Sequence, residues 1–210
     1  MAIAGEPEPS SLPLLPRQIR REANRQAIMI AVDALLENIS YDDLRVEDVM
    51  SEAGLTRTAF YRYFPDLESV LLAWLDVVRV EFEEAANRWL ALDVDPDAGI
   101  LAATTGLAEV WSRHSRLLKA ILDAATSGSR IQGTWRQMVE SFFAPVERRF
   151  ADLAARGRLS VAHPEETARA LVWMCERYLS ETFTRDLNVP VQTAGATLAD
   201  IWRRVALGVG

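Results

Sequence analysis

The sequence predicts an all-α fold. Apolar side chains recur three and four residues apart through most of the 210-residue chain, which is the spacing that gives a helix one apolar face. No stretch shows the alternation of apolar and polar residues that is typical of a half-buried strand. Helix breakers such as Gly54, Gly157 and Pro190 fall between the periodic segments. We therefore expect a bundle of helices without a sheet.

The chain begins with a proline-rich arm. Residues 1–16 contain four prolines, which cannot hold a helix, so we expect a flexible segment. The arm lacks the continuous apolar stretch of a secretory signal peptide. No uncharged run in the chain reaches the roughly 18 residues of a membrane span. A cytoplasmic location without membrane contact is expected.

A basic helix is predicted from Arg17 to about Asn38. Its apolar positions predict an inward face, formed by Ala27, Ile30, Ala31, Ala34 and Leu35. Its first turns carry four arginines, at positions 17, 20, 21 and 25, against the single acid Glu22. The start of this helix is therefore positively charged although the whole chain has a net charge of −7.

Residues 46–64 contain two short helical patterns joined by a turn. Val46, Val49 and Met50 recur at i, i+3 and i+4 and form one apolar stripe on the first pattern. Gly54 supplies the backbone freedom that a sharp turn requires. This arrangement is typical of a helix-turn-helix.

The second pattern predicts a helix from Arg57 to Phe64. Thr56 is placed to cap its first turn, and Phe60 with Phe64 forms an inward pair. In a DNA-binding helix-turn-helix the opposite, exposed face enters the major groove, where arginines bond guanine edges or phosphates and hydroxyls bond phosphates. The predicted DNA-binding residues are Arg45, Thr56, Arg57, Thr58, Tyr61, Arg62 and Tyr63.

A helical hairpin inside an all-helical protein, with tyrosines as ordinary packing residues, is the alternative interpretation. The net charge of −7 argues against a nucleic-acid partner, because DNA affinity comes largely from neutralised phosphates. The distribution of charge matters more, since the acids lie mostly outside the basic helix and the helix-turn-helix. This context favours double-stranded DNA as a partner. The proline-rich arm is then either a tail without a role, which we favour, or a minor-groove arm.

From about Arg20 to Leu72 the chain resembles the N-terminal DNA-binding domain of the TetR family of transcriptional repressors. Two positions depart from the family pattern. Leu67 stands where the family usually has a phosphate-contacting lysine, and Ala59 where many members have threonine. The residues that carry the resemblance are Ala53, Gly54, Leu55, Thr56, Phe60, Tyr61, Tyr63 and Phe64, followed by Pro65, Asp66 and Glu68.

The remaining segments predict further helices. The apolar pattern that follows Asp66 continues to about Leu90 without a breaker, which predicts one long helix leading into the rest of the chain. Pro145 should kink the helix in which it lies, because proline removes a backbone hydrogen bond. The expected helices are 97–114, 115–127, 131–156, 164–185 and 191–207. The resemblance implies a DNA-binding domain at 17–66 and a helical regulatory domain at 67–210.

Large aromatic residues lie on several of these helices. Such rings most often fill a hydrophobic core. Six tryptophans in the chain are nevertheless many, because each buried indole nitrogen needs a hydrogen-bond partner that an apolar core does not offer. We therefore predict an apolar pocket for a hydrophobic small-molecule effector. Its expected residues are Ile100, Leu107, Trp111, Trp135, Met138, Phe142, Val172, Cys175 and Trp202, with Trp173 in the same aromatic group.

The segments around Trp135, 171–179 and 200–202 also resemble a mycobacterial member of the family. That relative has asparagines at the positions of Val172 and Cys175, so the resemblance implies a more apolar ligand here. Polar contacts would then come from Thr104, Thr105 or Ser141.

Catalysis and cofactors find little support. His114 and His163 are the only histidines, and neither has a partner at metal-ligand spacing. The sequence has no phosphate-binding glycine loop and no nucleophile elbow. The single cysteine, Cys175, is either a redox sensor or, as its apolar neighbours indicate, a buried and inert thiol. We expect a protein that is not an enzyme and binds no cofactor or metal.

The family resemblance implies a homodimer that packs through the last two long helices. A stripe of small and apolar residues on the last helix would let two copies approach closely. The alternative is that this stripe packs in the core of a single subunit. The stripe consists of Ala194, Gly195, Leu198, Ala199, Ile201 and Val205. The resulting hypothesis is a dimeric repressor on a palindromic operator, released by a hydrophobic effector. The alternatives are an apolar-ligand carrier and a DNA-organising protein without an effector.

Overall fold

The computed structural model describes residues 17–91, 95–125, 129–159, 161–185 and 187–208. The predicted all-α fold is confirmed, because these ranges contain helices and no strand. The predicted arm at 1–16 lies outside the described residues. The elements are α1 (Arg17–Leu36), η1 (Tyr41–Asp43), α2 (Val46–Glu52), η2 (Arg57–Arg62), α3 (Leu67–Leu90), α4 (Pro96–Arg113), α5 (Ser115–Ala124), α6 (Arg130–Glu140), α7 (Phe143–Ala155), α8 (Pro164–Thr184) and α9 (Val191–Leu207).

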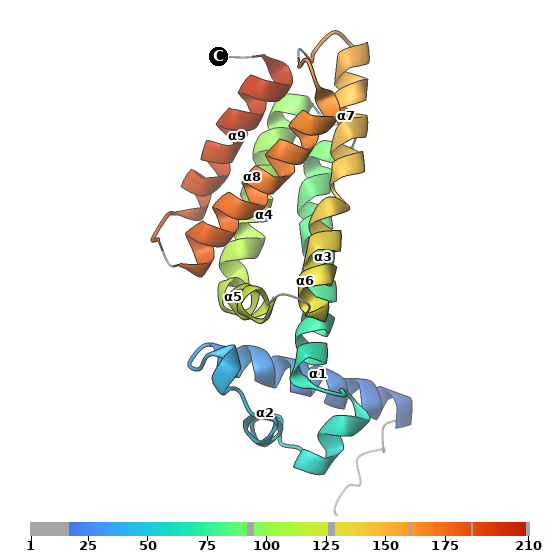
Figure 1. Cartoon of the computed structure of the whole chain (residues 1–210), viewed down its shortest axis with the longest axis vertical. Helices are drawn as coiled ribbons and strands as arrows, with labels where there is room; N and C mark the ends of the chain where they lie inside the picture. Colours follow the sequence, from blue (N-terminus) through green and yellow to red (C-terminus); the bar gives the residue numbers. More distant parts are fainter. Residues whose placement is uncertain (1–16, 92–94, 126–128, 160, 186, 209–210) are drawn as a thin grey trace, which may run out of the picture.

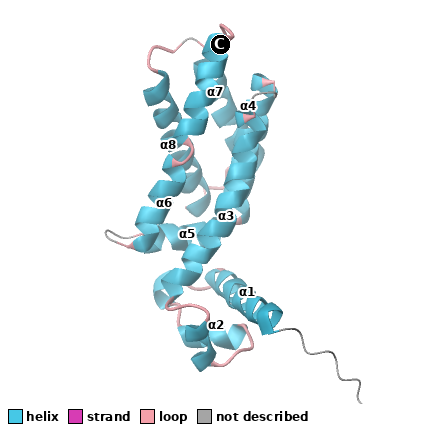
Figure 2. Cartoon of the chain, turned by 90° about the vertical axis from the view of Figure 1, so that its right-hand side faces the viewer, coloured by secondary structure: helices cyan, strands magenta, loops and turns pink. Residues whose placement is uncertain are grey.

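The molecule is elongated, with a small group of elements at one end (Figures 1 and 2). We call α1, η1, α2 and η2 the head, and α4 to α9 the body. Helix α3 starts beside the head and runs up into the body, so it contacts both parts (Figure 1). Helix α9 ends at the end of the body away from the head (Figure 1). Helix α3 is therefore the element that joins the head to the body.

Local chemistry explains where α3 begins. The Asp66 carboxylate accepts a hydrogen bond from the Ser69 amide at 2.7 Å, which satisfies a free donor of the first helical turn. One face of α3 is buried along its length, as the predicted apolar pattern requires. The Trp74 indole nitrogen donates to the Met29 carbonyl at 2.8 Å and ties α3 to α1. The predicted long helix is confirmed.

The predicted inward face of α1 is partly wrong. Ile30 is 55% exposed, and Ala34 is also exposed. The buried face instead centres on Ile28, Val32 and Leu36. Apolar residues occupy five consecutive positions from 28 to 32, so periodicity alone does not select one face. The packing of α1 against α2 and α3 makes the selection.

The expected kinked helix at 131–156 is in fact two helices. Helix α6 ends at Glu140 and α7 begins at Phe143. Pro145 has no amide hydrogen to donate to the Ser141 carbonyl, and its ring crowds that carbonyl. The break at residues 141–142 lies four and three residues before the proline, where this effect is expected.

The small-residue stripe of α9 packs inside its own subunit. Ala194, Leu198 and Ala199 are fully or almost fully buried in the single chain. Gly195 lies against α4, and its carbonyl accepts a hydrogen bond from the Thr104 hydroxyl at 2.9 Å. The dimer interpretation is therefore wrong for Ala194, Gly195, Leu198 and Ala199, because these residues are already buried within the single chain. Ile201, at 36% exposed, and half-buried Val205 lie at the edge of the stripe.

Gly195→Ala is expected to lower the free energy of unfolding. A Cβ at this position would lie 2.7 Å from the Thr105 Cα, so α4 and α9 would have to move apart. We expect a loss of about 1 to 3 kcal/mol, measured by denaturant unfolding. The control is Gly133→Ala in α6, where a Cβ meets nothing within 4 Å and helix propensity should make the change neutral or stabilising. Equal stability of the two variants would contradict the close α4–α9 contact.

Candidate nucleic-acid interface and apolar cavity

The second part of the helix-turn-helix is a 3₁₀-helix, η2, which ends at Arg62. The prediction of an α-helix to Phe64 is therefore wrong. The Ala59 amide donates to the Thr56 carbonyl at 2.8 Å, which is the tighter three-residue spacing. Pro65 lies three residues after Arg62 and has no amide hydrogen to donate to a longer helix. Thr56 occupies the N-cap position without a side-chain cap, and its hydroxyl lies 3.4 Å from that of Thr58 instead.

The inward pair of η2 is as predicted. Phe60 is 0% exposed, and Phe64 is 3% exposed. The Phe60 ring packs edge-on against Tyr61, with centroids 5.4 Å apart, and lies 6.2 Å from the Phe64 ring. The Arg25 guanidinium carbon lies 5.0 Å from the centroid of the Phe64 ring and connects α1 to this cluster. The cluster holds η2 against α1 and α2.

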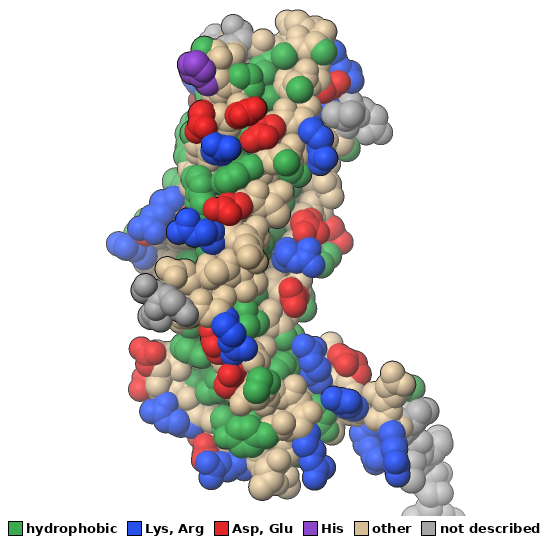
Figure 3. All heavy atoms as spheres, turned by 45° about the vertical axis from the view of Figure 1, so that its right-hand side comes forward, with side chains coloured by type: hydrophobic (Ala, Val, Ile, Leu, Met, Phe, Trp, Pro, Cys, Tyr) green, Lys and Arg blue, Asp and Glu red, His purple; other side chains and the backbone are tan. Residues whose placement is uncertain are grey.

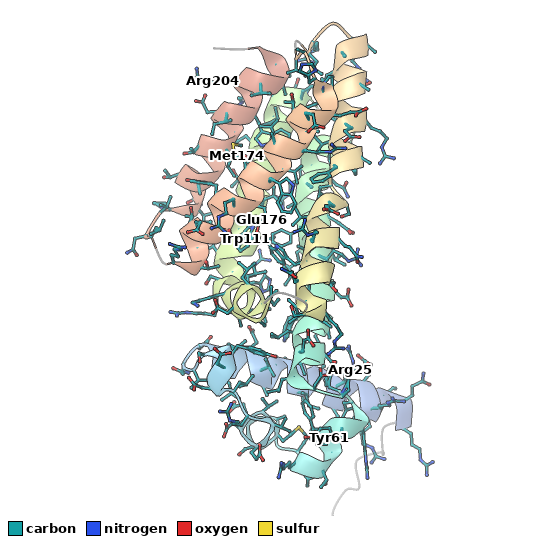
Figure 4. The ribbon with its side chains drawn as sticks, viewed as in Figure 1. Arg25, Tyr61, Trp111, Met174, Glu176 and Arg204 are labelled. Carbon is teal, nitrogen blue, oxygen red and sulfur yellow. The ribbon has the colours of Figure 1, made fainter. Side chains whose placement is uncertain are left out.

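The solvent side of η2 carries most of the predicted DNA-binding residues. Tyr61 is 61% exposed and projects from the end of the head (Figure 4). Arg57 forms a 2.9 Å ion pair with Glu47, and both side chains are more than half exposed. Such an exposed pair is worth little in water, so a phosphate can replace it at low cost. Thr56, Thr58 and Arg62 are exposed on the same short segment.

Two predicted DNA-binding residues are already engaged within the protein. The Arg45 guanidinium donates to the carbonyls of Asp42 and Leu44, at 2.8 and 3.1 Å. Tyr63 is half-buried, and its hydroxyl accepts a hydrogen bond from the Asn24 amide group at 2.8 Å. Arg45 is still exposed, whereas Tyr63 presents only part of its ring.

A group of positive side chains lies on the head around the start of α1 (Figure 3). Arg17, Arg20 and Arg21 are exposed there, as the sequence predicts. The head therefore combines a basic edge with an exposed polar segment, which are the features needed to neutralise phosphates and read bases.

The body contains an apolar cavity bordered by α3, α4, α6, α7, α8 and α9. The free space between its side chains is about 790 Å³, including the part that opens to solvent. All nine predicted pocket residues lie on its wall. The wall also includes Thr104, one of the predicted polar contacts, and nine residues that were not predicted: Phe82, Ala86, Trp89, Leu90, Ala103, Val139, Val146, Glu176 and Leu179.

Aromatic rings build much of this wall. Trp111 packs edge-on against Trp135 with centroids 5.7 Å apart, and Trp89 packs against Trp202 at 5.1 Å. The Trp89 indole nitrogen is buried and has no hydrogen-bond partner in the described part of the chain. Trp173 does not join the group, because its ring packs against Phe143. The cavity wall is therefore built largely from aromatic rings in mutual contact.

The predicted polar contacts are mostly wrong. Thr104 lines the cavity, but its hydroxyl is engaged by the carbonyls of Ile100 and Gly195. Thr105 and Ser141 do not line the cavity, and the Ser141 hydroxyl donates to Met138 at 2.6 Å.

Glu176 is the polar wall residue that the sequence did not reveal. Its carboxylate accepts a 3.3 Å hydrogen bond from the Trp135 indole nitrogen. Burial raises the pKa of the Glu176 carboxyl, although the hydrogen bond and nearby Arg177 lower it. Glu176 lies four residues after Val172, and this spacing indicates that both share one face of α8. Its residue type gave the opposite indication, because glutamates mostly lie on the protein surface.

The Cys175 thiol lies in the same wall and is 6% exposed. Its sulfur accepts a hydrogen bond from the Trp202 indole nitrogen at 3.0 Å. Burial raises the pKa of this thiol to about 12, so it is protonated at neutral pH. Because the thiolate is the reactive form, the structure favours the interpretation of Cys175 as a buried and inert thiol and not as a redox sensor.

The described residues contain no cluster of three or more potential metal ligands. His114 instead bonds Glu81 at 3.0 Å, and His163 stands at the start of α8. Among the same residues, no helix combines the length and apolar character that crossing a membrane requires.

Comparisons with known proteins match both parts of the chain. Residues 31–74 match the model of bacterial regulatory proteins of the tetR family, and residues 100–207 match that of the C-terminal domain of the transcriptional regulator EthR. The HTH-type transcriptional regulator EthR of Mycobacterium tuberculosis is 30% identical over 182 residues, which cover 84% of this chain and 83% of EthR.

Solved structures share the fold. NalD of Pseudomonas aeruginosa, the secondary repressor of the MexAB-OprM multidrug efflux pump, superposes with a TM-score of 0.73 at 21% identity, covering 90% of this chain and 98% of NalD. A complex of SmeT with triclosan gives a TM-score of 0.69 at 20% identity, covering 88% of this chain and 92% of SmeT.

Proposed function

Because this chain belongs to the TetR family of bacterial transcriptional regulators and has an EthR-type C-terminal domain, we propose that it is a dimeric repressor controlled by a hydrophobic effector. The proteins that establish this membership are named as regulators, not enzymes. The free protein would hold a palindromic operator through its two heads. An effector in the body cavity would release it.

The observation that carries the effector proposal is the cavity itself. Its wall is almost entirely apolar and aromatic, which suits a hydrophobic ligand. It also includes residues of α3, the helix that begins beside the head. A complex with triclosan is known for SmeT, a protein of the same fold, and supports a small apolar ligand for this chain as well.

A cluster of ion pairs offers a route from the cavity to the head. Arg130, at the start of α6, pairs with Asp66 at 2.9 Å and with Glu68 at 2.8 Å, at the start of α3. The same helix α6 contributes Trp135 and Met138 to the cavity wall. A ligand that displaces α6 would therefore shift Arg130 and its ion pairs with Asp66 and Glu68. This shift would couple the effector cavity to the DNA-binding head.

A dimer is needed because one recognition segment reads only a few base pairs. Two heads must reach half-sites roughly 34 Å apart or a multiple of that distance. Helices α8 and α9 lie side by side on one side of the body (Figure 1). We propose that their solvent sides form the interface, including half-buried Met174, Tyr178 and Val205 and exposed Ile201. The stripe around Gly195 is not part of it.

The functional division that we propose falls at Asp66, with DNA binding by residues 17–66 and effector binding and dimerisation by residues 67–210. A regulator of chromosomal genes acts where the bacterial chromosome is, so we propose a cytoplasmic location.

Operator binding tests the head. We expect Arg57→Ala to weaken binding by about 1 to 3 kcal/mol, because its exposed guanidinium is placed to contact a base or phosphate. Tyr61→Phe, which removes one phosphate-bonding hydroxyl, should cost less. Binding is measured at fixed salt on DNA that the wild-type protein selects from a random pool.

The matched control is Arg156→Ala in the body, which removes an exposed guanidinium that pairs with a carboxylate, Asp152, at 2.9 Å. Wild-type affinity in both head variants would overturn the assignment of η2. A wild-type protein that selects no sequence would favour the carrier alternative. Specific binding that no apolar compound weakens would favour a DNA-organising protein.

A further inference from the structure

Glu176 stands at the boundary between two hollows of the body. One is the apolar cavity, and the other is a polar surface groove bordered by α5, α6 and α8. Trp135 and Glu176 are the two residues that line both. Figure 4 labels Glu176 and Trp111 in the body, and both residues line the apolar cavity. Their position makes Trp135 and Glu176 the partition between the cavity and the groove.

The other acids of this groove are already paired. Asp123 pairs with Lys119, and Glu181 pairs with Arg177 and Arg185. Glu176 makes no ion pair in the described part of the chain, and its one hydrogen bond there comes from the Trp135 indole at 3.3 Å. A bond of that length lies at the weak end of the usual range. The carboxylate therefore has unused capacity to accept hydrogen bonds.

The rings beside Glu176 suit a positive charge. Trp111 and Trp135 lie edge to face with centroids 5.7 Å apart in the same wall. A cation over an indole face is attracted by the negative charge of the ring face, and this attraction grows when water is excluded. The Glu176 side chain is half-buried, and a carboxylate that loses part of its water is stabilised when a positive group accompanies it. A cationic ligand would supply a positive group in direct contact with the carboxylate, whereas a neutral ligand would leave it only the more distant charge of Arg177.

We propose that the cavity selects hydrophobic cations: amphiphiles whose ammonium group binds Glu176 and the Trp135 ring at the partition, and whose apolar tail fills the cavity. This inference rests on the proposed function and names its class of effector. The head group would replace the Trp135 hydrogen bond to Glu176, and so would open the partition as it binds.

Three probes with the same tail test the charge preference: decylamine, 1-decanol and decanoate. Calorimetric titration at neutral pH, below the micelle concentration, gives their dissociation constants with the full-length protein. We expect decylamine, which is protonated there, to bind at least tenfold more tightly than 1-decanol. Decanoate should bind most weakly. Equal affinities for decylamine and 1-decanol would overturn the proposal, and this comparison requires only wild-type protein.

The variant Glu176→Gln keeps the shape of the side chain and removes its charge. We expect it to lose the preference for decylamine while its affinity for 1-decanol stays within twofold of wild type. The control is Glu181→Gln on the same helix, which removes a charge from the same groove and should keep the preference. A preference retained in Glu176→Gln, or lost equally in Glu181→Gln, would overturn the role of Glu176.

Operator release separates this inference from the proposed function. If decylamine and 1-decanol bind equally and both release the operator, the cation preference is wrong and the repressor proposal stands. If neither binds while operator binding persists, both the cation preference and the effector role of the cavity are wrong.

Discussion

Phe60→Ala is expected to destabilise the head by about 3 to 5 kcal/mol, the usual cost of truncating a buried phenylalanine. Phe60 is 0% exposed and packs against Tyr61 and Phe64. Its removal leaves a cavity under η2, so α1, α2 and η2 should lose their shared core. Specific operator binding should be lost with them, although Phe60 itself has no surface to offer to DNA.

Hydrogen exchange checks this expectation within one molecule. Amides of α1 and α2 should exchange much faster in Phe60→Ala, while those of α4 and α9 should stay protected, because stability is local in such a fold. Tyr61→Ala is the control, since its ring is 61% exposed and its loss should barely change protection. Unchanged protection of α1 in Phe60→Ala would mean that the ring is not the centre of the core of the head.

Leu107→Trp is expected to abolish operator binding in a protein that stays folded. Leu107 is half-buried on α4 and lines the cavity. A larger ring at this position should occupy the space that we assign to the effector and hold the body in its ligand-bound form. A packed core would respond differently, with a loss of about 1 to 3 kcal/mol from overpacking and no selective loss of DNA affinity.

Two measurements on the same variant decide between these outcomes: melting temperature and operator affinity. The control is Leu101→Trp, on the same helix but 40% exposed and outside the cavity wall, which should bind the operator normally. If Leu107→Trp melts well below wild type while its folded fraction binds DNA normally, the cavity is not coupled to the head.

Helix ends were predictable because their signals are local. The sequence predicts a last helix at 191–207, and α9 has these bounds. Pro190 precedes it, and Gly208 follows it in the left-handed conformation, with φ at 64°. At the start of α3 the local signal is the Asp66 carboxylate, which accepts a hydrogen bond from the Ser69 amide. In each case the residue that ends or begins the helix acts on atoms within four residues of itself.

The members of the cavity wall were also predictable. Aromatic residues at helical spacing must share a face, and the residue type indicates that the face is apolar. All nine expected residues, from Ile100 to Trp202, consequently lie on one wall. The unexpected members include Trp89 and Glu176, whose positions depend on which helices surround them.

What the sequence by itself determined is therefore the all-α fold, most of the helices and their ends, and the residues that share the cavity wall. What only the tertiary structure decided is the partner of each face: α4 rather than a second subunit against Gly195, α2 and α3 against the Ile28 side of α1, and an apolar cavity beside Glu176. The physical reason is the range of the interactions. Helix capping and periodicity act within one or two turns, whereas burial depends on residues distant in the sequence.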